Sequence, residues 1–444
     1  MYCYSEIGGF NMGMLQSLKN IPLRSVVSTL NILEREEKLK ATLLGIGPMT
    51  MTVIRATIEL AKEKDFPVMF IPSRNQIDID EFGHGYVMNW DQKRFADTID
   101  TICRETGFDG ILYLWRDHGG PWQRDEEYKL KLPINESMDR AKKSYLSDMD
   151  NGFTVLHIDP TKDPHIDTVL PAEVIIDRII ELMDWIENKR KEKDLGTIDY
   201  EVGTEEIKGS AIDPVAFEKF IINLLKRLDE KKLPRPCFIV GQTGTLLRMR
   251  KNVGKYNLTM TKELTKIAKR YGLLFKEHNT DYLDEKILEL HPEIGIGMSN
   301  VAPEFGHEET KAYLELTEIE EKTAKKKKFD TSNFVNIIQE AVLKSGKWRK
   351  WLFKEDTGLT ESDIIADKEK LKEIIIVNGH YMYNEPQVES SIKKLINNLR
   401  KYCNIKNPEK IVIDRVKNSI MKYVTAFNLE GLTSKILNRV GGGK

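Results

Sequence analysis

Short apolar runs rich in β-branched residues recur at fairly even intervals up to about residue 300. Each run is followed by glycine, proline or polar residues and then by a longer amphipathic stretch, which is typical of a buried strand that leads into a helix. The eight strands that this pattern predicts are Ala41–Pro48, Pro67–Ser73, Gly110–Trp115, Thr154–Asp159, Ile198–Gly203, Pro236–Gly241, Leu273–Glu277 and Ile294–Met298.

The stretches between these strands have the apolar spacing of helices, and several place acidic residues early and Lys or Arg late, which suits the helix dipole. The clearest are Phe95–Thr106, Val174–Lys191, Pro214–Glu230 and Lys262–Tyr271. Near-continuous apolar strands must be buried on both faces, so eight strand–helix alternations favour an α/β fold with a closed parallel (β/α)8 barrel. A doubly wound open sheet is the alternative.

The pattern changes after the eighth strand. Glu308–Ala324 is expected to be a charged helix, and the basic run Lys325–Lys328 is expected to be a solvated linker. The chain is then mainly helical to Arg439 and ends in a glycine-rich tail. We therefore expect a barrel over residues 1–330 and a helical C-terminal region over residues 331–444 that packs on it.

Composition narrows the classes of protein that fit. The 444 residues are 40% hydrophobic with a formal net charge of -1, so a large core is possible and no bias toward nucleic acid or a membrane surface is present. No apolar run reaches the ~20 residues of a membrane span. Cysteines 3, 103, 237 and 403 form no CxxC pair, which argues against a zinc finger or disulfide scaffold. We expect a cytoplasmic protein, in which a homo-oligomer stays possible.

The carboxyl ends of the expected strands carry many chemically capable side chains, and this is where barrels place their active sites. Three of the eight histidines fall there. The candidates, in strand order, are Asn75, Gln76, Asp117, His118, His157, Asp159, Glu205, Gln242, His278, Asp281, Ser299 and Asn300.

Histidine and carboxylate ligands from different strands suit Zn²⁺, or Mn²⁺ or a similar ion, and such an ion could polarise a ketose carbonyl and its neighbouring hydroxyl. We expect His118, His157, His278 and Glu205 as ligands. His157 and Asp159 are two residues apart and share one strand face, where they are either ligands or hydrogen-bonded partners of ligands. The remaining amide, hydroxyl and carboxylate groups at Asn75, Gln76, Gln242, Asp281, Ser299 and Asn300 are expected to bind substrate.

Small residues after the strands give a weak indication of phosphate binding, because free backbone N–H groups can cradle an anion. These residues are Gly209, Ser210, Gly244 and Thr245. Gly45-Ile46-Gly47 lacks the third glycine of a dinucleotide fingerprint, and no GxxxxGK[ST] loop exists, so a nucleotide cofactor is not expected.

With these motifs identified, the sequence resembles the accessory, or "non-catalytic", subunit family of class II D-tagatose-bisphosphate aldolases, which includes ketose 4-epimerase-like members. The matching segments, in order along the chain, are Arg74-Asn75-Gln76, Phe82–Tyr86, Asp117–Pro121, Gly152–Asp159, Gly203-Thr204-Glu205, Glu277–Tyr282 and Lys417-Asn418-Ser419. The sequence departs from the family pattern at Glu206–Ser210, at Asn300–His307 and in an inserted loop at Glu126–Asp139.

The resemblance implies a TIM barrel related to class II aldolases, in which an Asp-His pair after one strand supplies an acid/base group and a metal ligand. On that analogy Asp117 transfers a proton, His118 is a ligand, and His278 and Glu205 are further candidates. Asp159 is a second candidate for proton transfer. The implied substrate is a ketohexose such as tagatose or fructose, free or phosphorylated.

Three functions fit the sequence. The first is a metal-dependent enzyme that inverts C4 of a ketohexose, by retro-aldol cleavage and re-addition or by proton exchange, or performs related aldol-type chemistry. The second is an accessory subunit that stabilises and activates a separate class II aldolase. The third, a tagatose-6-phosphate kinase, ranks last because no phosphate loop or kinase signature is present.

Overall fold

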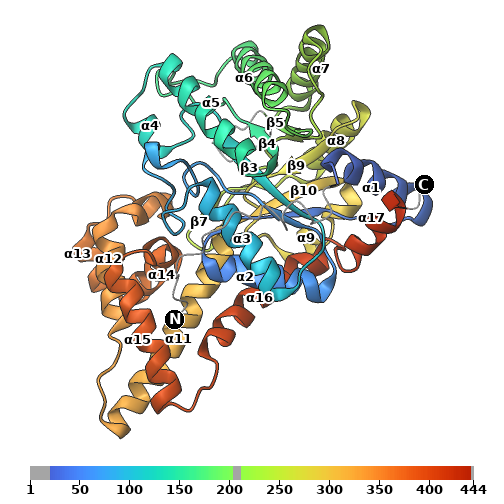
Figure 1. The fold of residues 1–444 in the computed structure, drawn as a ribbon. Coiled ribbons are helices and arrows are strands. Elements are labelled where there is room, and N and C mark those ends of the chain that lie inside the picture. Colours follow the sequence, from blue (N-terminus) through green and yellow to red (C-terminus); the bar gives the residue numbers. More distant parts are fainter. Residues whose placement is uncertain (1–20, 204–211, 442–444) are drawn as a thin grey trace.

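Eight parallel strands close into a barrel in the computed structural model, which describes residues 21–203 and 212–441 (Figure 1). Around the barrel the order is β1, β2, β3, β4, β5, β6, β9 and β10, with β10 pairing back to β1. Their bounds are Leu43–Ile46, Val68–Phe70, Leu112–Gly119, Phe153–Ile158, Asp199–Gly203, Phe238–Val240, Leu274–Glu277 and Ile296–Val301. The predicted closed barrel is confirmed, and the doubly wound alternative is wrong.

Helices surround the barrel and connect its strands. They are α1 (Leu23–Glu37), α2 (Met51–Lys64), the short η1 (Asp80–Phe82), α3 (Gln92–Thr106), α4 (Asp125–Lys129), α5 (Ile134–Asp150), α6 (Ala172–Glu192), α7 (Pro214–Lys231), α8 (Leu258–Arg270), α9 (Glu285–Leu288) and α10 (His291–Ile294). Side chains of Thr50, Asp91, Asp213 and Asn257 accept hydrogen bonds from backbone N–H groups in the first turns of α2, α3, α7 and α8. These caps satisfy N–H groups that would otherwise lack partners, so the helices start where the sequence places a polar cap.

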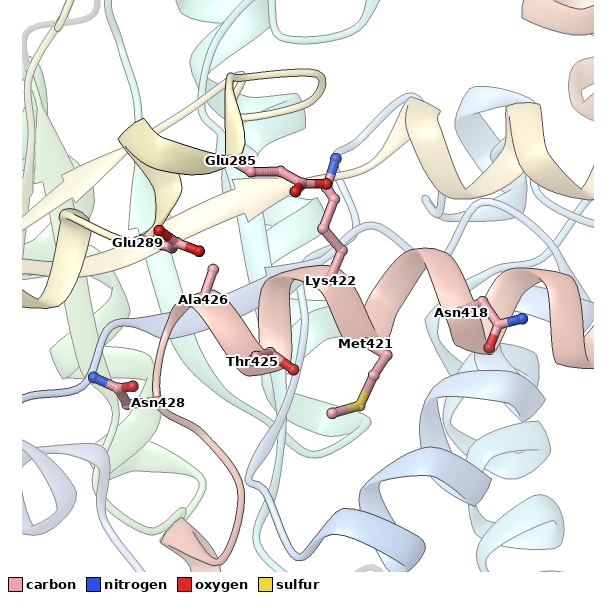
Figure 2. A pocket seen from close by; sticks show the side chains of 8 residues that line it. All are labelled: Glu285, Glu289, Asn418, Met421, Lys422, Thr425, Ala426 and Asn428. Atoms are coloured by element: carbon pink, nitrogen blue, oxygen red, sulfur yellow. The ribbon is translucent and has the colours of Figure 1, made fainter.

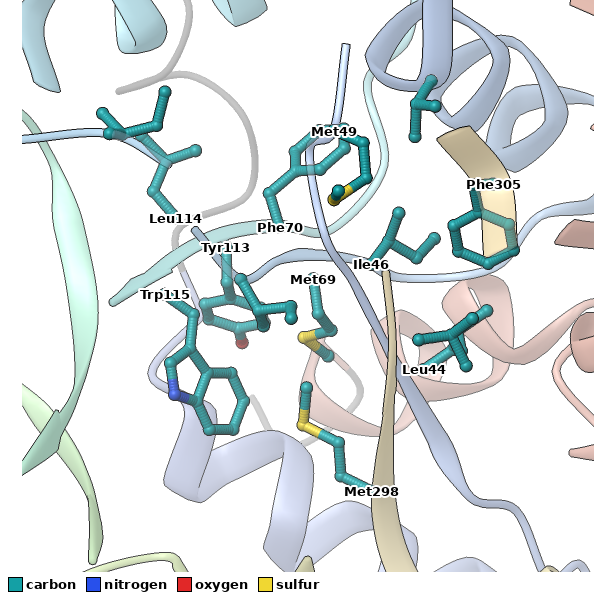
Figure 3. Close-up of a cluster of buried hydrophobic side chains, with 14 of the residues drawn as sticks. Leu44, Ile46, Met49, Met69, Phe70, Tyr113, Leu114, Trp115, Met298 and Phe305 are labelled. Carbon is teal, nitrogen blue, oxygen red and sulfur yellow. The ribbon is translucent and has the colours of Figure 1, made fainter. Parts of the chain in front are cut away.

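The interior of the barrel is apolar toward the amino-terminal ends of the strands and polar toward their carboxyl ends. Residues paired in register on parallel strands point to the same side, so Met69, Tyr113 and Met298 share the interior with Trp115 (Figure 3). The Trp115 ring lies 5.3 Å from that of Phe238. These side chains fill the part of the barrel nearer the amino-terminal ends of the strands. Ionisable groups at the next inward positions therefore pack against apolar side chains.

Helix α1 closes the amino-terminal end of the barrel. Arg24 at its start donates to the buried Asp199 at 2.7 Å, and the Tyr113 hydroxyl donates to the carbonyl of Ile21 at 2.6 Å. Both partners in the barrel point inward from their strands. These two bonds fix the chain at the start of α1 to the amino-terminal end of the barrel.

The C-terminal region is helical and returns to the barrel. Its elements are α11 (Pro303–Lys327), α12 (Phe334–Ser345), η2 (Lys347–Trp351), η3 (Lys354–Asp356), α13 (Glu361–Ala366), α14 (Lys368–Asn378), η4 (Gly379–Met382), α15 (Pro386–Tyr402), α16 (Pro408–Ala426) and α17 (Leu432–Gly441). Helix α16 packs against α2 and α11, and α17 packs against α1. The boundary expected near residue 330 falls between α11 and α12, and the division into two parts stays a prediction.

Part of this region lies over the carboxyl ends of the barrel strands. The Met249 N–H, in the turn of the small hairpin β7 (Leu247–Arg248) and β8 (Lys251–Asn252), donates to the Trp351 carbonyl. Asn384 donates to the carbonyl of Tyr86 at 2.5 Å, and Lys350 lies 3.5 Å from Asp125. The C-terminal region thus contacts loops that follow β2, β3 and β6.

No helix within the described ranges is long and apolar enough to cross a membrane.

The junction between α16 and the barrel depends on Tyr423, which is fully buried, with its hydroxyl donating to Glu304 at 2.6 Å. We expect Tyr423→Ala to lower the free energy of unfolding by about 3–5 kcal/mol, because a large buried ring is lost. Tyr423→Phe keeps the ring and loses only the hydrogen bond to a charged group, at about 1.5–3 kcal/mol. Urea unfolding measures both, and a cost below about 1 kcal/mol for Tyr423→Ala would contradict this packing.

Candidate metal centre

Four ionisable side chains meet at the carboxyl end of the barrel, and we call them the carboxylate–histidine cluster: Asp117, His157, Glu201 and His278. They come from β3, β4, β5 and the residue that follows β9. All four residues are at most 5% exposed. The neighbouring strands β3, β4 and β5, and the end of β9 beyond β6, therefore direct one potential ligand each to a common point.

The spacing within this cluster fits a metal ion. His157 Nδ1 lies 3.4 Å from Asp117 Oδ1 and 3.5 Å from Glu201 Oε1, whereas His278 Nε2 lies 3.6 Å and 3.2 Å from the same two oxygens. Two ligand atoms of a tetrahedral Zn²⁺ ion, each about 2.0–2.1 Å from it, are about 3.3–3.4 Å apart. Imidazole nitrogen with carboxylate oxygen is also a donor set that Zn²⁺ and similar ions accept. The residues present therefore fit a divalent metal.

His118 borders the cluster in a left-handed backbone conformation, with φ of 44°. This uncommon geometry for a residue other than glycine occurs often at functional sites. Its Nδ1 lies 2.7 Å from Asp159 Oδ2, and its ring centre lies 4.8 Å from that of His278 and 5.6 Å from that of His157. The three predicted histidines do converge. His118, His157 and Asp159 form a second group with metal-ligand spacing.

His157 belongs to both groups, and its ring has a further contact. The backbone N–H of His118 lies 3.3 Å from His157 Nδ1 and donates to it. The imidazole can therefore accept from the chain or bind an ion through this nitrogen, but not both. The two expectations for His157, a ligand or a partner that orients ligands, both remain predictions.

Two members of the site were missed by sequence reasoning, Glu201 and Lys276. Lys276 Nζ lies 2.7 Å from Glu201 Oε2, 3.9 Å from Asp117 Oδ1 and 4.3 Å from the centre of the Trp115 ring. Both residues are fully buried and point inward from β5 and β9. The signal for these two residues in the sequence is a charged side chain within a predicted strand rather than at its carboxyl end.

The surroundings keep both carboxyl groups of the cluster ionised. Burial raises the pKa of Asp117, but His118, His278 and Lys276 outweigh it and hold that pKa well below its ordinary value. Burial likewise opposes ionisation of Glu201, but His157 and Lys276 lower its pKa to about 2. Charged neighbours within a few ångströms thus override desolvation. Asp117 is therefore a proton acceptor rather than a proton donor at neutral pH.

Asn300 reaches the cluster from β10, the strand that pairs with β9. Its Nδ2 donates to Asp117 Oδ2 at 3.3 Å. The neighbouring strand makes room for it at Gly45, because a Cβ there would lie 2.2 Å from Asn300 Oδ1. The predicted substrate-binding residue Asn300 therefore contacts the predicted proton-transfer residue.

The other predicted substrate-binding residues lie around or outside this centre. Asn75 bonds to Gln123 and Asp125, and Gln76 bonds to Ser73 and Met49. Ser299 points out of the barrel toward His291, and Asp281 accepts from the N–H groups of Ala302 and Glu304 at the start of α11. Gln242 is buried, and its Oε1 has no hydrogen-bond partner in the described part of the chain.

The weak phosphate candidates separate into two groups. Gly244 has φ of 93° and is packed against the backbone of Lys255, and the Thr245 hydroxyl donates to the His278 carbonyl at 2.9 Å. Thr245 therefore helps to position a residue of the cluster. Glu205, Gly209 and Ser210 lie outside the described residues.

A groove of about 480 Å³ lies away from this centre. It borders α16, where the Glu285 carboxylate lies toward the Lys422 amine (Figure 2). It shares no residue with the carboxylate–histidine cluster. The chemistry of the side chains, rather than cavity size, identifies the candidate site.

A closed parallel barrel with a buried carboxylate–histidine cluster at the carboxyl ends of its strands defines the class of this protein: a TIM barrel with a candidate metal centre. The sequence profile described as D-tagatose-1,6-bisphosphate aldolase subunit GatZ/KbaZ-like matches residues 30–213 and 226–423. The chain belongs to this family, which confirms the resemblance seen in the sequence. No sequence among the curated proteins matches the chain significantly.

Solved structures agree with the fold. A probable tagatose 6 phosphate kinase from Sinorhizobium meliloti 1021 is 19% identical, with a TM-score of 0.70 over 87% of this chain and 100% of that one. The fructuronate-tagaturonate epimerase UxaE from Cohnella laeviribosi is 13% identical, with a TM-score of 0.54 over 88% of this chain and 82% of that one. At such low identity these likenesses establish the fold alone.

Metal binding by the cluster can be measured directly. We expect the purified protein to bind about one equivalent of Zn²⁺ in the cluster, and Glu201→Gln or His278→Ala to weaken that binding by at least ~100-fold, since each removes a direct ligand. Titration calorimetry after chelation, with elemental analysis of the protein as purified, gives both values. His84→Ala, at an exposed histidine, is the matched control. Unchanged affinity in the cluster variants would show that the cluster is a hydrogen-bonded network without an ion.

Proposed function

We propose that this protein is a metal-dependent enzyme of ketohexose metabolism that inverts C4 of tagatose or fructose, free or phosphorylated, through aldol-type chemistry. The observation that carries this proposal is Asp117. Its carboxylate is buried and held ionised, and within the described residues its Oδ1 makes no hydrogen bond. Lys276 Nζ, 3.9 Å away, offsets part of the charge on this oxygen, and an ion or a substrate hydroxyl would supply the missing hydrogen-bond partner.

Asp159 fits the same role less well. Its Oδ2 lies 2.7 Å from His118 Nδ1, and its Oδ1 accepts from the hydroxyl of Thr161 at 2.5 Å. Both oxygens are therefore already engaged in orienting neighbouring groups. Asp117 is the better base because its Oδ1 makes no hydrogen bond, and it serves as the base when His157, Glu201 and His278 alone hold the ion.

In the proposed C4 inversion, one carbon–carbon bond breaks and re-forms, and one proton leaves the C4 oxygen and returns to it. Zn²⁺, the ion that the donor set fits best, supplies Lewis acidity toward the C2 carbonyl when bound. Asp117 takes the proton of the C4 hydroxyl, and the C3–C4 bond breaks, leaving an aldehyde at C4 and an electron pair delocalised toward C2. Renewed attack on the opposite face of the aldehyde re-forms the bond, and Asp117 returns the proton to the C4 oxygen. Lys276 and Asn300 keep the carboxylate in place during both transfers.

We expect Asp117→Asn to lower the interconversion of fructose and tagatose, or of their 6-phosphates, by ~10²–10⁴-fold, the usual contribution of a positioned general base. Metal content should fall less than in Glu201→Gln, because the two imidazoles and Glu201 remain. Chromatography of sugars incubated with the metal-loaded protein measures the rate. Asp125→Asn, an exposed carboxylate after the same strand, is the control. Loss of metal in proportion to loss of activity would make Asp117 a ligand rather than the base.

The second candidate function is an accessory subunit for a separate class II tagatose-bisphosphate aldolase. The description of the family as an aldolase subunit favours it. In this case the barrel stabilises or activates its partner, and the cluster serves structure or regulation. The family membership supports this function, whereas the buried ionised carboxylate with an available oxygen supports the enzyme.

The two functions predict opposite results with the isolated protein. We expect interconversion of ketohexoses by the metal-loaded chain alone, because the base and a fitting ligand set are both present in it. The comparison adds a purified class II aldolase to the wild type and to Asp117→Asn and follows the aldolase's thermal midpoint and rate. Absence of any interconversion, with an aldolase stabilised equally by both proteins, would establish the accessory function instead.

A further inference from the structure

A second cavity, of about 130 Å³, lies where the barrel meets the C-terminal helices. Its walls come from the connection between β1 and α2, the loop after β2, helix α11, η4 and the start of α15. None of its wall residues belongs to the carboxylate–histidine cluster. The cavity is therefore a separate site, and its polar lining shows what it could hold.

His380 on η4 is the first unusual wall residue. It is 3% exposed, yet neither of its ring nitrogens has a hydrogen-bond partner in the part of the chain that the structure describes. Its ring lies against α11 at Gly306, where a Cβ would be 2.7 Å from His380 Cγ. Gly306 belongs to the segment Asn300–His307 that departs from the family pattern. The chain thus makes room for a buried imidazole that has no partner of its own.

Glu309, which lies about one turn after Gly306 on α11, is the second unusual wall residue. Its side chain is buried, and the Thr50 hydroxyl donates to its Oε2 at 2.5 Å. No lysine, arginine or histidine among the described residues lies within ion-pair distance of it. Burial raises the pKa of Glu309 to about 7, so the carboxyl can donate as well as accept a proton near neutral pH. The wall therefore contains a carboxyl group without a counter-charge.

The rest of the wall is mixed. Tyr313 and Tyr383 add aromatic faces and hydroxyl groups, Thr52 adds another hydroxyl, and Met51 and Ile392 add apolar contacts. Neither lysine nor arginine lines the cavity as described. An anionic ligand would find no positive wall residue, and a purely apolar ligand would leave both nitrogens of the His380 imidazole unsatisfied.

A hydroxyl group donates and accepts at one atom, which suits a cavity whose wall contains both an uncharged imidazole and a carboxyl group. The volume sets the size of the ligand, because an engineered apolar cavity of ~150 Å³ in another protein holds benzene, with six non-hydrogen atoms. A three-carbon polyol also has six such atoms. The lining residues and the volume of the cavity therefore both favour a small polyol.

We propose that this cavity binds a neutral polyhydroxylated molecule of about three carbons, such as glycerol or an unphosphorylated triose. The hydroxyls of the ligand pair with His380 and Glu309, and its carbon chain lies against the methionine and tyrosine side chains. The exposed Met88 lies at the rim, where a ligand can enter.

Ligand-observed NMR of the metal-loaded full chain tests the proposal with glycerol and dihydroxyacetone, and with glycerol 3-phosphate as the anionic counterpart. We expect saturable binding of the two neutral compounds, at least tenfold weaker binding of the phosphate, and at least tenfold weaker glycerol binding in His380→Phe. Met88→Trp, which narrows the rim and leaves the buried polar groups intact, should weaken binding as well. This second variant guards against a folding defect in the first.

Asp117→Asn separates this proposal from the proposed function, because it should retain glycerol binding while it loses sugar interconversion. Binding that disappears in Asp117→Asn and persists in both His380→Phe and Met88→Trp would place the polyol at the metal centre and overturn the proposal. Tighter binding of glycerol 3-phosphate than of glycerol would overturn the proposal that the ligand is neutral. No saturable binding of any compound would mean that the cavity holds water only, which also overturns it.

Discussion

The structure depends on how a closed barrel accommodates ionisable side chains in its interior. Asp117 and Glu201 carry negative charge away from bulk water, and Lys276 is the buried cation that contacts both. Removing one partner of such a buried pair costs about 3–5 kcal/mol, because the other charge is left uncompensated. Lys276 packs on the ring of Trp115, which contacts Phe238. These apolar rings cannot replace a charged partner that is removed. The barrel can keep these groups only as a set.

Buried ion pairs outside the barrel wall hold the strand that supplies the Asp-His pair. Arg116 on β3 binds Asp148 on α5, and Arg74 binds Glu127 with two hydrogen bonds of 2.8 and 2.9 Å. These planar, two-point contacts fix direction as well as distance. They hold the ends of β2 and β3, where His118 adopts its left-handed conformation. A rigid frame thus supports a strained residue at the edge of the candidate metal centre.

The sequence predicted the eight strands and the closure of the barrel because apolar runs and helical spacing are local signals. It also predicted that His118, His157 and His278 converge, since parallel strands bring their carboxyl ends to one face. It did not predict Glu201 and Lys276, because the side of the barrel wall to which a strand residue points depends on how the strands pair. Ser299 and Asn300 show this dependence, since the first points outward and the second inward. The contacts of the C-terminal helices with the β2, β3 and β6 loops are non-local, and no spacing along the chain encodes them.

Helix α11 connects the two polar sites. The loop that carries His278 continues into Asp281, whose carboxylate accepts from backbone N–H groups at the start of α11, and into Tyr282, whose hydroxyl lies 2.8 Å from His307 Nδ1. The same helix packs against His380 at Gly306 and contributes Glu309 to the wall of the small cavity. The cavity and the metal centre therefore share no residue, but α11 forms part of the cavity wall and is bonded to the loop that carries His278.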